Sequence, residues 1–158
     1  MRFFLTFVVL CLLATATVSC ATNTAPESYI TAQPIAQREP RSWQQAEQLI
    51  LKAAEHPMVS VEKIGHSHEG RTHYFVSMEQ TPSPSWKVFF LGVQHGDEIS
   101  GAEAIMDLME DFTKNPEAYP EDIGIYAIPV QNPDGFAKFQ RRNGENFDLN
   151  RDHHIISQ

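Results

Sequence analysis

Two pairs of residues in this sequence have a spacing that suits metal binding. His95-Gly96-Asp97-Glu98 and His66-Ser67-His68-Glu69 each place a carboxylate three residues after an imidazole. That offset lets one loop or one helical turn direct both groups at a single cation, and zinc accepts both kinds of ligand. His95 directly follows an apolar run, whereas His66 stands in a polar turn, so His95 and Glu98 are the candidate metal ligands. The alternative for this pair is a solvated helix N-terminus, where acidic residues are favoured by the helix dipole.

A second cluster of polar residues lies farther along the chain. It contains Asn132-Pro133-Asp134-Gly135, then Arg141-Arg142-Asn143, then Asp148-Leu149-Asn150-Arg151-Asp152. The first of these is an ordinary turn signal, and the arginines could be surface charges. Asn150 and Arg151, however, set a planar guanidinium beside an amide, a combination that grips a carboxylate well.

The elements that would position these residues alternate between strand and helix. Residues 86–93 are nearly all apolar, which predicts a central strand buried on both faces. Residues 99–112 repeat apolar side chains at helical spacing, and 123–128 form another apolar strand that ends at Pro129. The pattern predicts an α/β sheet, in which ligands gather beyond the carboxyl ends of the strands.

Upstream of these elements the sequence predicts a helix and a hairpin. Ser42 and Gln45 have the spacing of a capping box, which predicts a helix over 43–55. Alternating residues near Val59 and over 72–76 predict two short strands around the turn 65–71.

The amino-terminal end has the features of an export signal. Residues 1–19 join a basic residue, a short apolar run and small residues, as in a secretory signal peptide. Cys20 then follows small residues, which resembles a bacterial lipobox and predicts a lipidated mature N-terminus. Ordinary cleavage after Ala21 is the alternative. Residues 20–41 have the polar composition of a tether, and only Cys11 and Cys20 are cysteines, so the exported chain has no disulfide.

Composition narrows the function classes. The 158 residues include 12 Lys and Arg against 20 Asp and Glu, a net charge of −8 that argues against a nucleic-acid partner. The apolar content of 42% is that of a globular domain, here expected over 42–158.

The ordered motifs resemble the zinc carboxypeptidases of the carboxypeptidase A family. The shared stretches are the segment from His95 to Glu98, Asn-Pro-Asp-Gly at 132–135, Arg141-x-Asn143, and Asp-Leu-Asn-Arg at 148–151. The turn Gly65-His66-Ser67-His68-Glu69-Gly70-Arg71 also looks like a stretch that precedes the zinc motif in this family, which gives that turn a structural role.

The resemblance implies a role for each candidate residue. His95 and Glu98 would be two of three protein ligands to one Zn²⁺ ion, and Arg141 would polarise the scissile carbonyl. Asn150 and Arg151 would grip the terminal carboxylate of a peptide. The implied fold is α/β, a mixed and mostly parallel sheet with flanking helices, incomplete at its C-terminal end. Arg142 could replace Arg141, but the spacing to Asp148 favours Arg141.

Three departures from the family pattern qualify the resemblance. Gly96-Asp97 stands where many animal members carry an arginine, as in bacterial relatives such as murein peptide amidases, which favours cell-wall or other bacterial peptides as substrates. Asp152 stands where asparagine is common.

The family's third ligand and its general-base glutamate lie farther downstream, so residues 42–158 are expected to be the N-terminal part of a catalytic domain, inactive alone. His153 and His154 are the substitute ligands to consider.

Two other functions stay open at this point. A deacylase of the succinylglutamate desuccinylase and aspartoacylase type shares the His-x-x-Glu zinc site and also binds carboxylates. A lipid-anchored binding module could keep the grip of Asn150 and Arg151 without catalysis. The expected location is the periplasm or the outer membrane of a bacterium, with membrane contact only through a lipidated Cys20.

Overall fold

The first helix begins where the capping residues predict. The computed structural model describes residues 39–151. Helix α1 (Trp43–Ala53) is preceded by Ser42, whose hydroxyl accepts from the Gln45 amide at 3.3 Å, while the Gln45 side chain accepts from the Ser42 amide at 2.8 Å. The predicted helix is therefore confirmed, and it ends two residues earlier than expected. The predicted signal peptide, Cys20, His153 and His154 lie outside the described residues.

The predicted hairpin is also present. Strands β1 (Val59–His66) and β2 (Thr72–Met78) pair antiparallel, and the turn between them contains Gly70 at a φ of 80°. A positive φ of this size is readily adopted by glycine, which explains how the turn closes.

A strand, a polar loop and a helix then follow in the predicted order. Strand β3 (Trp86–Leu91) is followed by the loop that contains His95 and by helix α2 (Ser100–Lys114). After a short 3₁₀ turn, η2 (Pro116–Ala118), the chain enters β4 (Ile123–Ile128), the predicted strand.

The sheet is mixed. Its order is β1-β2-β4-β3, with β3 and β4 parallel and the other two pairings antiparallel. The predicted mixed α/β sheet with flanking helices is confirmed. Within residues 39–151, however, it is not mostly parallel, because the hairpin adds both of its strands in antiparallel pairings.

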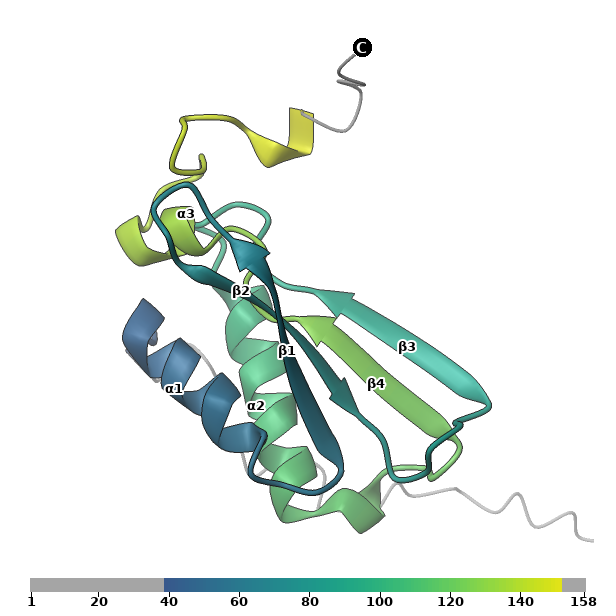
Figure 1. Ribbon diagram of the computed structural model, residues 1–158. Helices are drawn as coiled ribbons and strands as arrows, with labels where there is room; N and C mark the ends of the chain where they lie inside the picture. The colour runs from purple at the N-terminus through teal and green to yellow at the C-terminus, as the bar shows by residue number, and fades with distance from the viewer. Residues whose placement is uncertain (1–38, 152–158) are drawn as a thin grey trace, which may run out of the picture. The chain divides into compact units, whose positions relative to one another are not determined.

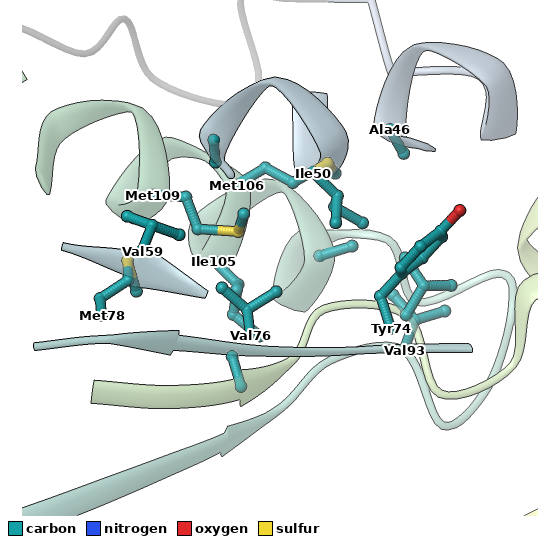
Figure 2. Close-up of a cluster of buried hydrophobic side chains, with 14 of the residues drawn as sticks. Ala46, Ile50, Val59, Tyr74, Val76, Met78, Val93, Ile105, Met106 and Met109 are labelled. Atoms are coloured by element: carbon teal, nitrogen blue, oxygen red, sulfur yellow. The ribbon is translucent and has the colours of Figure 1, made fainter. Parts of the chain in front are cut away.

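One face of the sheet carries the core. Helices α1 and α2 lie side by side over this face, as Figures 1 and 2 show. Side chains from both helices meet alternate residues of the strands, among them Ile50, Met106, Met109, Val76 and Met78. No helix between residues 39 and 151 is long and apolar enough to cross a membrane.

The prediction of a central strand buried on both faces is wrong for the described residues. Strand β3 is an edge strand of the described sheet, and all six of its residues are exposed. Phe89 keeps 52% of its surface in solvent, although its ring contacts that of Phe75. The reason is topological, since the buried core residues on the strands come from β1, β2 and β4 and none from β3.

Candidate active site

The loop after β3 is held tightly against the end of β4. Gly92 donates to the carbonyl of Ile128, and Gln131 donates back to the carbonyl of Gly92 at 2.8 Å. The next residue, Val93, has a φ of 53°, a conformation that β-branched residues rarely adopt. Strain of this kind persists only where the surrounding structure imposes it, and it is common beside functional sites.

His95 and Glu98 come together as the sequence predicts. The Nδ1 atom of His95 lies 3.0 Å from Oε1 of Glu98, and the other ring nitrogen, Nε2, lies 3.1 Å from Oδ1 of Asp148. His95 is buried, with 5% of its surface exposed, whereas the Glu98 side chain is 63% exposed. The pair therefore joins a fixed imidazole to a carboxylate that faces solvent.

Asp148 determines which nitrogen of His95 carries the proton. Burial alone would raise the pKa of Asp148, but hydrogen bonds from His95, the Asn150 amide and Arg141 outweigh burial and hold the pKa below its ordinary value. An ionised carboxylate only accepts hydrogen bonds, so Nε2 of His95 must donate to it. In a neutral imidazole, Nδ1 then keeps its lone pair and faces the oxygen of Glu98.

Two acceptors that face each other at 3.0 Å require a proton or a cation between them. Zinc binds imidazole nitrogen and carboxylate oxygen at about 2.0–2.2 Å, so His95 Nδ1 and Glu98 Oε1 are close enough to share one ion. A carboxylate behind the imidazole is the usual partner that orients a metal-binding histidine. The residues present therefore fit a zinc ion. Asp148 is the residue whose role sequence reasoning missed, and its place in the Asp-Leu-Asn-Arg motif was the available signal.

The side chain of Arg141 contacts both Asp148 and Glu98. Its Nε donates to Asp148 at 3.1 Å, and its Nη1 reaches Oε1 of Glu98 at 3.5 Å. The neighbouring guanidinium of Arg142 donates instead to the backbone carbonyl of Asn146. The geometry thus favours Arg141 over Arg142 for a role at the site.

Asn150 and Arg151 join this group less directly. Both lie in the 3₁₀ turn η3 (Leu149–Arg151), and the Asn150 amide donates to the Asp148 carboxylate at 3.0 Å. The guanidinium of Arg151 donates to the carbonyl of Asn150 and is exposed to solvent. The structure therefore unites His95, Glu98, Arg141 and Asp148, and sets Asn150 and Arg151 beside them through the backbone.

The Asn-Pro-Asp-Gly segment begins a short helix instead of forming only a turn. Helix α3 (Pro133–Lys138) starts with Pro133 in its first turn, and the side chain of Asn132 caps it by accepting from Gly135. A fixed proline φ and an asparagine cap both favour helix initiation, which explains the difference from the sequence expectation. The Asn132 amide also donates to the carbonyls of Gln94 and Arg141, at 3.4 and 3.3 Å.

The second His-x-x-Glu pair has a different environment. His66 is the last residue of β1, and Glu69 in the following turn binds Arg71 and Lys138. Salt bridges engage this carboxylate, in agreement with the structural role that the sequence resemblance gives to the turn. Among residues 39–151, no group of three His, Cys, Asp or Glu side chains is placed to hold a metal ion.

Comparison with known proteins decides the family. The family model described as zinc carboxypeptidase matches residues 47–157. The chain belongs to the zinc carboxypeptidase family. It is 32% identical over 121 residues to human carboxypeptidase D, a match that covers 63% of this chain and 9% of that protein.

Solved structures share the fold. The metallo-carboxypeptidase from Burkholderia cenocepacia superposes with a TM-score of 0.64 and 23% identity over 72% of this chain and 33% of that one. The metallo-carboxypeptidase from Pseudomonas aeruginosa, in complex with (2-guanidinoethylmercapto)succinic acid, gives 0.60 and 24%, over 72% and 32%. The chain thus spans about a third of the length of these structures.

Proposed function

We propose that this chain carries part of the active site of a zinc-dependent metallocarboxypeptidase that removes C-terminal residues from peptides outside the cytoplasm. The observation that carries the proposal is the pair of acceptors, His95 Nδ1 and Glu98 Oε1, held 3.0 Å apart with Asp148 behind the imidazole. A catalytic zinc site normally has three protein ligands. We therefore assign two of them to His95 and Glu98 and the third to a residue outside 39–151.

Each nearby side chain has a part in hydrolysis under this proposal. A bound zinc ion would supply Lewis acidity and lower the pKa of water. Asp148 keeps the proton on Nε2 of His95, so the lone pair of Nδ1 stays available. Arg141, a fixed cation beside Glu98, stabilises the negative charge that develops on the carbonyl oxygen during attack.

The substrate we propose is a peptide with a free C-terminal carboxylate. Arg151 presents an exposed guanidinium, whose Nη1 donates to the backbone carbonyl of Asn150. The planar fork of a guanidinium binds carboxylates in a bidentate manner. The ligand bound to the Pseudomonas aeruginosa relative is a succinic acid derivative, and its carboxylates support the same chemistry here. Cell-wall peptides are the substrates to test first. Gly96-Asp97 stands between the two proposed ligands, where many animal members of the family carry an arginine and murein peptide amidases do not.

The test compares free and amidated peptides with the complete gene product. We expect zinc-dependent release of the C-terminal residue from free peptides and little hydrolysis of the same peptides amidated at that end. His95→Ala should abolish both stoichiometric zinc and activity, while the control His66→Ala should keep both. Equal hydrolysis of the amidated peptides, or zinc lost only from the control, would refute the assignment.

We further propose that the protein is exported and anchored by a lipidated Cys20, because small residues precede this cysteine and a polar tether follows it. Mass spectrometry of the mature protein should show an N-terminal Cys20 that carries lipid. A mature chain that begins at Thr22 without lipid would contradict the lipid anchor.

A further inference from the structure

A buried carboxylate ties the β1–β2 hairpin to the region of the candidate site. Asp134, on α3, has only 1% of its surface exposed. It accepts hydrogen bonds from the Ser67 hydroxyl at 2.6 Å, from Nη1 of Arg71 at 2.7 Å and from the Glu69 amide at 3.2 Å. All three donors belong to the hairpin turn, so the turn satisfies this carboxylate almost completely.

Helix α3 is packed against two loops of the candidate site. One is the loop after β3 that contains His95, and the other is the segment after α3 that contains Arg141. A Cβ placed on Gly96 would stand 1.9 Å from the carbonyl carbon of Gly135, and one on Gly144 would stand 2.4 Å from Oδ2 of Asp134. Neither loop can be lifted from α3 without opening a void, because the contact already requires glycine on the loop side. Figure 1 shows the hairpin turn, α3 and the segment after it gathered at one end of the sheet.

Hydrogen bonds continue this connection to the candidate catalytic groups. The cap residue Asn132 holds the carbonyl of Arg141 with its side-chain amide, and the Gly96 amide donates to the same carbonyl at 3.4 Å. The position of the Arg141 backbone therefore depends on α3, and the position of α3 depends on the hairpin.

The other contacts that join the hairpin turn to α3 and to the segment after it are weaker. His68 lies 3.3 Å from Glu145, but both side chains are more than half exposed, and exposed ion pairs contribute little. Lys138 on α3 pairs with Glu69, and the lysine is itself about half exposed. The buried contacts of Asp134 therefore dominate the attachment.

We propose that Ser67 and Arg71 are positioning residues for Arg141, and that they act through Asp134 and helix α3. This inference rests on the proposed function, and it adds to that function two residues that lie 28 and 24 positions before His95 and act through other residues. A buried carboxylate needs several hydrogen-bond donors. The loss of one donor to Asp134 should therefore loosen helix α3.

The kinetic test uses the complete gene product and a matched pair of hydroxyl deletions. Ser67→Ala removes the hydrogen bond to Asp134, whereas Thr81→Val removes a hydroxyl that binds the carbonyl of Glu121 at the other end of the sheet. We expect Ser67→Ala to lower kcat about tenfold with KM and zinc content unchanged, because a misplaced catalytic group slows the chemical step. Ser67→Thr, which keeps the hydroxyl, should restore kcat, and Thr81→Val should leave it unchanged.

Hydrogen exchange on the present chain provides a readout that needs no activity. In Ser67→Ala, amides of residues 94–98 and 139–148 should exchange roughly tenfold faster, which is the scale of one lost hydrogen bond to a charged group. Amides of α1 should not change. If the wild-type protein hydrolyses no peptide, the proposed function fails while the exchange result still decides the positioning role. Unchanged exchange in both loops, or a kcat equal to that of Thr81→Val, would overturn the inference.

Discussion

Removal of each of the two arginines assigned to the candidate site should change a different kinetic parameter. Arg151 would face a carboxylate that is charged before the reaction begins, whereas Arg141 would face charge that appears only in the transition state. Interactions made equally in both states set KM, and interactions made only in the transition state set kcat. Steady-state kinetics of the complete gene product should therefore show Arg151→Ala chiefly raising KM for free peptides. Arg141→Ala should lower kcat by about 10²–10³.

The comparison of Arg141 with Arg142 supplies the control for that experiment. Arg142 donates to the carbonyl of Asn146, away from Glu98, so Arg142→Ala should change kcat by less than Arg141→Ala does. If both active-site variants lose only kcat, the carboxylate grip of Arg151 is misassigned.

Asp134 should make stability depend on pH in the acid range. Burial alone would raise its pKa, but hydrogen bonds from Ser67, Arg71 and the Glu69 amide hold the pKa below its ordinary value. A carboxyl group with a lowered folded-state pKa stabilises the protein above its unfolded-state pKa, and this stabilisation is lost as the pH falls through the folded-state value.

The corresponding measurement is thermal unfolding of wild type and Asp134→Asn between pH 7 and pH 3. Wild type should be the more stable at pH 7, and the difference should shrink as the pH falls below about 4, near the ordinary pKa of aspartate. The control is Glu117→Gln, which changes an exposed carboxylate. A difference that stays constant for Asp134→Asn over this range would contradict the assignment.

At the scale of elements, the capping box sets the start of α1. Ser42 and Gln45 exchange two hydrogen bonds, and the helix they begin buries Trp43, Ala46, Ile50 and Ala53. Ser42→Ala should lower the free energy of unfolding by about 1 kcal/mol, the usual loss for an N-cap. Urea unfolding measures it, and Ser42→Asp should keep most of the stability because aspartate is an equally good cap. Equal losses in the two variants would mean that the hydroxyl does not act as a cap.

For the whole molecule, the notable feature is the apolar surface of the sheet. Strand β3 exposes Phe89 and Leu91 on the face opposite the helices, where the ring of Phe89 continues a cluster with Phe75 and Tyr126. Residues 39–151 contain no helix that covers this face. Apolar patches of this kind mark interaction surfaces or lead to aggregation.

This surface predicts measurable behaviour of the 158-residue chain. The chain should bind the dye ANS and associate as its concentration rises, and Phe89→Lys should weaken both effects. Gln44→Lys, which adds the same charge at an exposed position of α1, should change neither. Fluorescence titration and light scattering check the outcome, and equal effects of the two substitutions would show that charge alone is responsible.

The sequence by itself determined the local elements and the residues that could bind zinc. The cap at Ser42, the alternation in the hairpin and the apolar run of β4 depend on neighbours in the chain, so their patterns were sufficient. His95 and Glu98 were candidates from the local pattern, because Glu98 follows His95 by three positions after an apolar strand, and the resemblance of the ordered motifs supported their assignment as ligands.

Only the tertiary structure decided what surrounds those residues. Asp148 lies 53 positions after His95, and Ser67 lies 67 positions before Asp134, so no local pattern assigns a partner to either. The apolar run of β3 likewise could not reveal that its strand stands at an edge of the described sheet, since hydrophobicity records a tendency to be buried and not which element does the burying. Contacts between distant segments depend on how the elements pack, and packing is a property of the whole fold.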